Sequence, residues 1–269
     1  MLRDEVVLRA SGSSATVLPW RGGMATHCAI DGRDIFYVDD ATVNDPTKNV
    51  RGGAPVLFPS PGKLTNDRWA NGAMGQHGFA RGRAFAVTAR SDDSVTLRIE
   101  DDDASRQPYP FRFSFELTYT LSASALRIDT RVRNLGDAAM PFGVGFHPYF
   151  AVPAADKAKV RVPTGATRAF DNVTKTRVPY TTPDFAAGEV DLHLLDHGSS
   201  EAELLAPGGG VRLRGSAEYA HWVLWTLPGR DFVCVEPWTC PGDALNTGER
   251  LAHLAPGETS SLWLEIAPT

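Results

Sequence analysis

Side chains that could transfer protons or bind a small polar molecule gather in three stretches of the sequence. These stretches are residues 51–59 with 76–81, residues 143–150, and residues 233–239. Each combines ionisable groups with glycine, proline and aromatic residues, and aromatic rings beside polar groups form platforms for the apolar faces of sugars. The chemistry that they suggest is acid–base work on a polar, ring-shaped ligand.

Glu236 and His147 are the best candidates for acid–base chemistry. Glu236 follows an apolar run and precedes Pro237, so we expect it to leave the strand ladder where the strand ends. Apolar neighbours such as Trp238 would partly desolvate its carboxyl group, and desolvation raises a carboxyl pKa toward neutrality. His147 also lies at an expected strand end, and an imidazole titrates near neutral pH. Taken alone, the two residues are explained equally well as a surface carboxylate and a core histidine bonded to the backbone.

Cationic and polar groups accompany this pair. Arg51 and Arg81 offer fork-shaped donors for hydroxyl or phosphate oxygens, and His77 stands among glycine-flanked turns. Solvated surface arginines and a histidine that supports a loop account for the same residues. Cys234 and Cys240 lack the spacing of a metal site and have no matching second pair.

The elements that must position these groups are strands. Apolar residues occupy the odd positions from Phe111 to Leu121, with polar residues between them, which predicts a long half-buried strand. A second alternating run follows at residues 126–132, and the short link 122–125 predicts a hairpin. Further strands are expected at 6–8, 84–88, 95–99, 159–162 and 262–266, and more fully buried strands at 222–225 and 232–235.

The fold class follows from this pattern. No stretch has convincing helical periodicity, and the 25 glycines and 19 prolines interrupt the chain as often as a many-stranded antiparallel protein requires. We therefore predict an all-β protein, a large antiparallel β-sandwich that forms a single domain over residues 1–269. Residues 51–81 and 163–210 do not fit the strand pattern, and we expect them to be long loops that carry function.

Composition and charge argue against several classes of partner. The net charge of -5 disfavours nucleic acid, whose phosphate backbone requires a basic surface. No apolar run is long enough to span a bilayer, and residues 1–5 carry charges instead of the apolar core of a signal peptide. The three cysteines, Cys28, Cys234 and Cys240, suit a reducing compartment, so we expect a cytoplasmic protein that is a monomer or a homodimer.

Taken together and in order, these motifs resemble the galactose mutarotase-like superfamily, which includes the aldose 1-epimerases. They cover most of the chain, and their order and spacing are more specific than any one of them. The matching segments are Arg-x-Gly-x-Pro-x-x-Phe-Pro at 51–59, Gln-His-Gly-Phe-Ala-Arg at 76–81, Gly-x-His-Pro-Tyr-Phe at 145–150 and Glu-Pro-Trp at 236–238.

The resemblance implies both a fold and a mechanism. The family fold is a large antiparallel sandwich, often called a supersandwich, and its chemistry uses no metal and no other cofactor. The glutamate that matches Glu236 removes the proton of the anomeric hydroxyl. The histidine that matches His147 protonates the ring oxygen, so that the sugar ring opens and then closes to the other anomer. By the same resemblance, Arg51 and His77 bind sugar hydroxyls and Arg81 lines the pocket.

The family also places an aspartate opposite a sugar hydroxyl. The stretch 195–198 resembles that segment, so Asp196 is our candidate, and Asp191 is close enough to be the alternative. The expected partner is a small-molecule sugar.

The sugar is either a free aldose or a sugar 6-phosphate. In the branch that acts on phosphates, arginines that match Arg51 and Arg81 help to bind the phosphate, and this chain adds Lys63 and Arg68 in the same region. The loop 59–63 departs from the aromatic-rich version of that branch, which favours a free aldose.

Three other functions remain open. His77, His147 and Glu236 form the ligand set of a non-haem iron site, although the histidines of such sites usually lie close in sequence. A sugar-binding domain that senses rather than converts its ligand would not need an acid–base pair. Glycoside hydrolysis requires two carboxylates, which Asp196 and Glu236 could supply, and it would leave His147 without a role.

Overall fold

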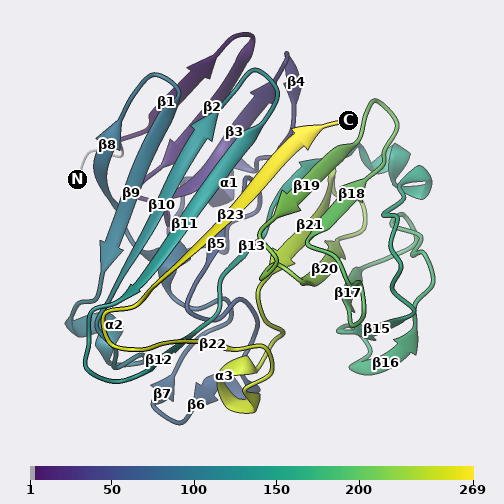
Figure 1. The fold of residues 1–269 in the computed structure, drawn as a ribbon. Helices are drawn as coiled ribbons and strands as arrows, with labels where there is room; N and C mark the ends of the chain where they lie inside the picture. The colour runs from purple at the N-terminus through teal and green to yellow at the C-terminus, as the bar shows by residue number, and fades with distance from the viewer. Residues whose placement is uncertain (1–3) are drawn as a thin grey trace.

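Strands dominate the computed structural model, which describes residues 4–269. Residues 1–3 belong to the N-terminal segment in which we expect no signal peptide, and they lie outside the described residues. Two large sheets lie against one another, and a smaller sheet stands beside them (Figure 1). All pairings between the named strands are antiparallel, which confirms the predicted fold class.

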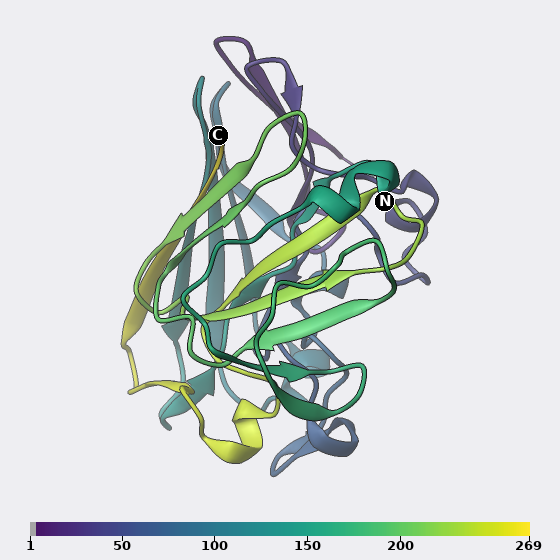
Figure 2. The same ribbon diagram turned by 90° about the vertical axis from the view of Figure 1, so that its right-hand side faces the viewer.

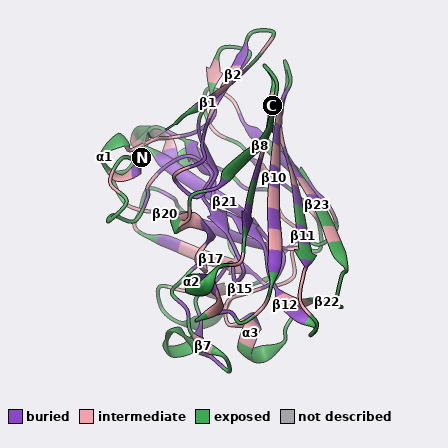
Figure 3. Ribbon diagram, turned by 90° about the vertical axis from the view of Figure 1, so that its left-hand side faces the viewer, coloured by how far each residue is buried: buried purple, intermediate pink, exposed green. Residues whose placement is uncertain are grey.

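The first large sheet has seven strands and contains the predicted hairpin. Its order is β18 (Glu201–Leu204), β19 (Val211–Gly215), β23 (Thr259–Pro268), β11 (Leu126–Asn134), β10 (Phe113–Leu121), β9 (Ser94–Glu100) and β8 (Ala86–Arg90). Buried and intermediate residues alternate along the whole of β10, as the period-two pattern predicts (Figure 3). Leu121 pairs with Leu126 across the turn, so the hairpin between β10 and β11 is confirmed.

The second large sheet has eight strands. Its order is β16 (Thr176–Pro179), β15 (Arg168–Asp171), β17 (Val190–Leu194), β20 (His221–Thr226), β21 (Phe232–Trp238), β13 (Gly145–Phe146) and β5 (Val56–Leu57), and β14 (Tyr149–Ala151) also pairs with β21. Every residue of β20 and β21 is buried, as expected for apolar runs without alternation. Figure 2 shows the strands of this sheet crossing in front of the seven-stranded sheet.

The two large sheets bury a shared aromatic core. Phe58, next to β5, stacks on Phe115 of β10 with ring centroids 4.4 Å apart and an interplanar angle of 17°. Both rings are fully buried, and burial of one such side chain stabilises the fold by roughly 1.5–3 kcal/mol. This contact ties the sheet that carries the candidate catalytic residues to the sheet behind it.

Short elements complete the structure. The smaller sheet contains β1 (Val6–Ala10), β2 (Ser13–Leu18), β3 (Met24–Ile30) and β4 (Arg33–Asp34), and the two-stranded ladders are β6 (Arg68–Trp69) with β7 (Gly72–Ala73) and β12 (Met140–Phe142) with β22 (Ala252–Leu254). The α-helices are single turns, α1 (Asp40–Val43), α2 (Asp103–Arg106) and α3 (Ala244–Thr247). No helix within residues 4–269 has the length and apolarity needed to cross a bilayer.

Two expectations about these elements are wrong. The predicted strand at 159–162 forms only one isolated bridge, between Arg161 and Leu205, because a 3₁₀ segment precedes it and Pro163 follows it. The region 163–210, expected to be a long loop, contains β15 to β18. These strands are short and partly exposed, so their hydrophobic pattern is weak.

Candidate active site

The pairing of strands places His147 directly opposite Glu236. Gly145 of β13 pairs with Trp238, and Tyr149 of β14 pairs with Cys234, so the same register brings residue 147 opposite residue 236. His147 lies just after β13, at a strand end as predicted. Its Nε2 is 3.3 Å from Oε1 of Glu236. Directly opposed residues in an antiparallel sheet are close enough for their side chains to meet.

Glu236 itself differs from the expectation. It lies inside β21, which continues through Pro237 to Trp238, and not at the end of the strand. The ladder on the His147 side is interrupted between β13 and β14, and a proline is tolerated beside such an interruption. The carboxyl group is therefore buried in the middle of the sheet, with 1% of the residue exposed.

Both groups line a cavity of about 540 Å³, which is of the size that holds a small ligand. The cavity wall includes three candidates from the sequence, Arg51, His77 and Arg81, together with residues that the sequence did not single out. The latter are Asn49, Asn172, Val173, Lys175, Glu189, His193, Val223 and Trp225. Gln76 and Trp238 belong to the motifs quoted from the sequence, and Lys63 and Asp191 were named as secondary possibilities.

Burial shifts the acid–base properties of the pair. Desolvation raises the pKa of the Glu236 carboxyl group well above its ordinary value, with a further contribution from Asp191. Desolvation and the nearby charges lower the pKa of His147 well below its ordinary value. Each group is thus driven toward its neutral form, and the short contact lets one proton be shared between them.

Aromatic rings hold the His147 imidazole in place. Tyr149 stacks on it with centroids 4.8 Å apart and an interplanar angle of 16°, and Trp225 meets it edge to face at 5.4 Å. Its Nδ1 atom is buried without a hydrogen-bond partner among residues 4–269. The orientation of the ring therefore depends on packing, and Nε2 faces Glu236 as a result.

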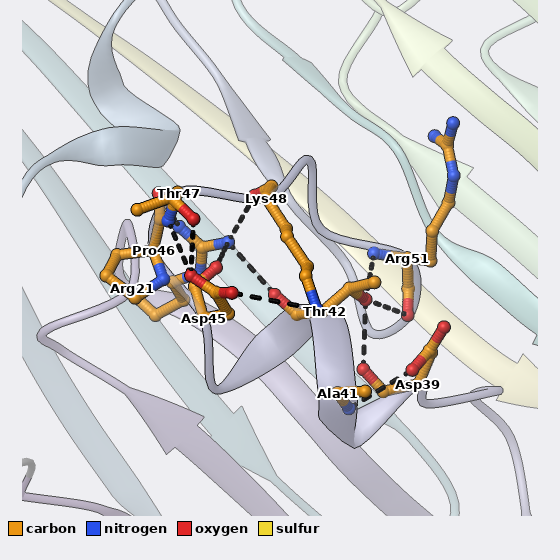
Figure 4. Close-up of polar contacts among 9 residues, drawn as sticks. All are labelled: Arg21, Asp39, Ala41, Thr42, Asp45, Pro46, Thr47, Lys48 and Arg51. Atoms are coloured by element: carbon orange, nitrogen blue, oxygen red, sulfur yellow. Dashed lines mark hydrogen bonds and ion pairs between the residues drawn. The ribbon is translucent and has the colours of Figure 1, made fainter.

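Arg51 reaches the cavity from a loop that a buried arginine organises. Arg21 donates hydrogen bonds to the carbonyl oxygens of Thr42, Asp45 and Lys48 at 3.1, 3.1 and 2.8 Å (Figure 4). Thr42 Oγ1 in turn accepts from the backbone N–H of Arg51 at 2.9 Å. The Arg51 side chain extends away from this network, donates to the Tyr149 hydroxyl at 3.4 Å and lies over the ring of Trp225.

His77 and Arg81 also line the cavity. The Nδ1 of His77 contacts the carbonyl oxygen of Pro61, which can only accept, so the neutral ring carries its proton on Nδ1. Burial, with Arg81 nearby, lowers the pKa of His77 to about 4, and its Nε2 is left as an acceptor. Neither Arg51 nor Arg81 forms an ion pair with a carboxylate of residues 4–269.

The structure corrects the prediction that Asp196 is the pocket aspartate, because Asp196 does not line this cavity. Its carboxylate accepts hydrogen bonds from the backbone N–H groups of Thr167 and Arg168 and from the Thr167 hydroxyl, and these bonds hold its pKa well below the ordinary value. Asp191 of β17 lines the cavity instead. Its Oδ2 accepts from Asn172 Nδ2 at 2.7 Å, and burial raises its pKa. The alternative named from the sequence is therefore the better placed aspartate.

His193 is a wall residue that the sequence did not mark as functional, whereas Trp238 was expected as an apolar neighbour of Glu236. Asp191 and His193 are two apart on β17, and that period-two spacing is the signal that could have linked them. It was missed because the region was expected to be a loop. Trp238 Nε1 donates to Glu236 Oε2 at 3.2 Å.

Among residues 4–269, one set of side chains could bind a metal ion, and it differs from the His77, His147 and Glu236 set considered as an alternative from the sequence. Ligand atoms of His147, Cys234 and Glu236 lie within 4.8 Å of one another. His77 is not part of that group, because its Nδ1 is bonded to Pro61 and its ring centroid is 5.6 Å from that of His147. The thiol of Cys234 is fully buried, and burial raises its pKa well above the ordinary value. These properties favour the neutral thiol over the thiolate that binds zinc.

Comparison with known proteins agrees with this fold. A family model described as aldose 1-epimerase matches residues 6–267. Protein LacX of Lactococcus lactis subsp. lactis is 26% identical over 237 residues, which cover 74% of this chain and 78% of that protein. The Slr1438 protein of Synechocystis sp. PCC 6803 has a TM-score of 0.95 at 32% identity, covering 100% of this chain and 96% of that one. A galactose mutarotase related enzyme from Lactobacillus acidophilus has the same fold, with a TM-score of 0.82 at 21% identity and coverage of 99% and 97%. The chain belongs to the aldose 1-epimerase family.

Proposed function

We propose that this protein interconverts the α and β anomers of an aldose by acid–base opening and closure of the sugar ring. Glu236 acts as the base and His147 as the acid. The observation that carries the proposal is the 3.3 Å contact between these two buried groups in the wall of a sugar-sized cavity. Membership of the aldose 1-epimerase family supports it.

The closeness of the two groups suits the chemistry. The anomeric hydroxyl and the ring oxygen are both bonded to C1, so the base and the acid must act on atoms close together. Glu236 accepts the proton of the anomeric hydroxyl, and His147 donates a proton to the ring oxygen. The bond between C1 and the ring oxygen breaks and leaves an aldehyde. Rotation about C1–C2 and reversal of both transfers close the ring to the other anomer.

Burial assists both proton transfers. The reaction begins with an ionised Glu236 and a protonated His147, and it leaves both neutral once the ring is open. Desolvation disfavours the two charged forms. Ring opening therefore converts a poorly stabilised ion pair into two neutral groups. Each positioned acid or base typically contributes about 10²–10⁴-fold to the rate.

The substrate that we propose is a free aldose, with the sugar 6-phosphate as the second candidate. The specific observation in favour of a phosphate is that Arg51 and Arg81 line the cavity without a carboxylate partner among residues 4–269. Arginine forks suit phosphate oxygens, and Lys63 is a further cation in the same wall. Sugar hydroxyls also accept from these donors, through weaker hydrogen bonds.

Anomer exchange measured by NMR tests the proposal. Native protein, Glu236→Gln and His147→Asn are compared on free aldoses and their 6-phosphates, starting from one anomer. We expect faster equilibration than in buffer, lost in both variants, and the ranking of substrates assigns the branch. If sugars bind without faster exchange, the protein is a sugar sensor and the catalytic roles of His147 and Glu236 are refuted.

A further inference from the structure

Two histidines from neighbouring strands form a hydrogen-bonded pair in the cavity wall. His193 of β17 lines the cavity, and His221, at the start of β20, lies behind it with 5% of the residue exposed. His193 Nδ1 and His221 Nε2 are 2.9 Å apart. Trp238 and Phe170 both meet the His193 ring edge to face, at 5.3 and 6.1 Å, which limits its rotation.

This contact restricts where the protons lie. Burial lowers the pKa of His193 to about 4 and that of His221 well below its ordinary value, so both rings are neutral at pH 7. A hydrogen bond between two neutral imidazoles contains one N–H, and one of the rings must be the donor. The partner on the other side of His193 decides which ring it is.

That partner is Asp191. Its Oδ1 lies 3.7 Å from His193 Nε2, and when Asp191 is ionised this oxygen attracts an N–H and repels a ring lone pair. His193 therefore carries its proton on Nε2, and His221 Nε2 donates to His193 Nδ1. A hydrogen bond of this kind, from a residue behind the ring, sets the tautomer of a functional histidine.

The gap between His193 and Asp191 has the dimensions of a hydroxyl site. At 3.7 Å the two side chains are too far apart for a good hydrogen bond with each other. Asp191 Oδ2 is bonded to Asn172, which leaves Oδ1 for a ligand. A hydroxyl group beside both atoms can donate to Oδ1 and accept from Nε2–H at the same time.

The family resemblance implies an aspartate opposite a sugar hydroxyl, and Asp191 lines the cavity in that role. We propose that His193 donates to the same ring hydroxyl, and that His221 is the positioning residue that keeps His193 as the donor. This inference rests on the proposed function in taking the ligand to be an aldose. An epimer with that hydroxyl on the other face of the ring presents a C–H group to both atoms and leaves a buried donor and acceptor unpaired. Sites built to bond a hydroxyl reject ligands that lack it, so this pair determines specificity.

Monodeoxy sugars provide the test. We expect His193→Leu to lower kcat/KM for the parent aldose roughly 10- to 100-fold, mainly through KM, because one hydrogen bond is lost. For one monodeoxy analogue, the one that lacks the recognised hydroxyl, native protein and variant should agree within about two-fold. A loss of equal size on every analogue, or no loss on the parent sugar, would overturn the proposal.

Paired amide variants separate recognition from folding. The amide nitrogen of glutamine reaches the position of Nε2, whereas that of asparagine stops near Nδ1, so His193→Gln should retain most of the activity and His193→Asn should not. His221→Gln can still donate to His193 and should raise KM less than His221→Leu, with kcat little changed in both. His253→Leu alters an exposed histidine of β22 and serves as the control. Equal KM values for the two His221 variants would remove His221 from the proposal.

Calorimetric binding of the same sugars keeps the two proposals separate. If native protein binds aldoses without exchanging anomers, the proposed function fails, but the comparison of parent and deoxy sugars still measures the hydroxyl contact in Kd. If exchange is fast and Kd shows no dependence on His193 for any sugar, the proposed function stands and this inference fails.

Discussion

Trp238 donates a hydrogen bond from its indole Nε1 to Oε2 of Glu236, two residues earlier on the same strand, at 3.2 Å. Both side chains project from the same face of β21, as residues two apart on a strand must. The bond counteracts part of the effect of burial, because it stabilises the ionised carboxylate and so lowers the pKa of Glu236. The other carboxylate oxygen, Oε1, is left to His147.

Removal of this bond should change the pH dependence of catalysis. In Trp238→Phe the pKa of Glu236 should rise further. The active pair holds one proton, and loss of that proton from Glu236 inactivates it at alkaline pH, so the alkaline limb of kcat/KM should move up by about one pH unit or less. The pH profile of anomer exchange measures the shift. Trp263→Phe, on β23, is the matched control and should leave the profile in place. An unmoved limb in Trp238→Phe would show that this bond does not tune the base.

The two catalytic candidates should behave as one unit. Glu236→Gln and His147→Asn should each lower kcat about 10²–10⁴-fold. The kcat of the double variant should be little lower than that of the less active single variant, because each change alone breaks the same proton exchange. Glu189→Gln changes another carboxylate in the cavity wall and should keep kcat within a few-fold. Additive losses in the double variant would argue against a shared proton.

Buried neutral histidines should make stability fall at acidic pH. Burial lowers the pKa of His77 from 6.5 to about 4, so the unfolded chain binds a proton in a range where the folded protein does not. The resulting contribution to the free energy of unfolding is present above pH 6.5 and is lost as pH falls toward 4. It amounts to at most about 3 kcal/mol. Denaturant unfolding from pH 7 to 4 should show a steeper decline for native protein than for His77→Gln.

The loop that carries Arg51 should depend on Arg21. Arg21→Met leaves the carbonyl groups of residues 42–48 without their buried donor, and we expect a loss of about 2–4 kcal/mol in the free energy of unfolding. KM for the sugar should rise several-fold, while kcat changes little, because the role expected of Arg51 is to bind the sugar and not to react with it. Chemical denaturation and anomer exchange measure the two effects. Arg9→Met, at an exposed position of β1, is the control, and unchanged KM in a destabilised Arg21→Met would limit Arg21 to folding.

Much of the fold could be predicted because alternating residues face either the core or solvent. The strand pattern from Phe113 to Leu121 is regular, and the hairpin that follows it lies where the short link 122–125 predicted. The family resemblance confirmed by the comparisons depended on motifs that are contiguous in sequence. Both kinds of signal are local, which is why one sequence was enough.

The remaining parts of the site depend on contacts between distant segments. Asp196 and Asp191 are five residues apart, but Asp191 lies within β17 at the cavity, whereas Asp196 lies beyond the end of that strand and is bonded to Thr167 and Arg168. His193 has an aspartate two residues before it, but its contact with His221 exists only because β17 pairs with β20. Strand register across such pairs is not encoded in any short motif.

The register that sets His147 against Glu236 also has a kinetic consequence for folding. The segment around His147 is held between residues 53–57 on one side and β21 on the other, and all three come from distant parts of the chain. Pairings of such long range generally form late, after local hairpins. On refolding from denaturant, circular dichroism should therefore recover before activity does. Enzymatic activity would then report completion of this sheet, and a fragment that lacks residues 53–57 or β21 would not regain it.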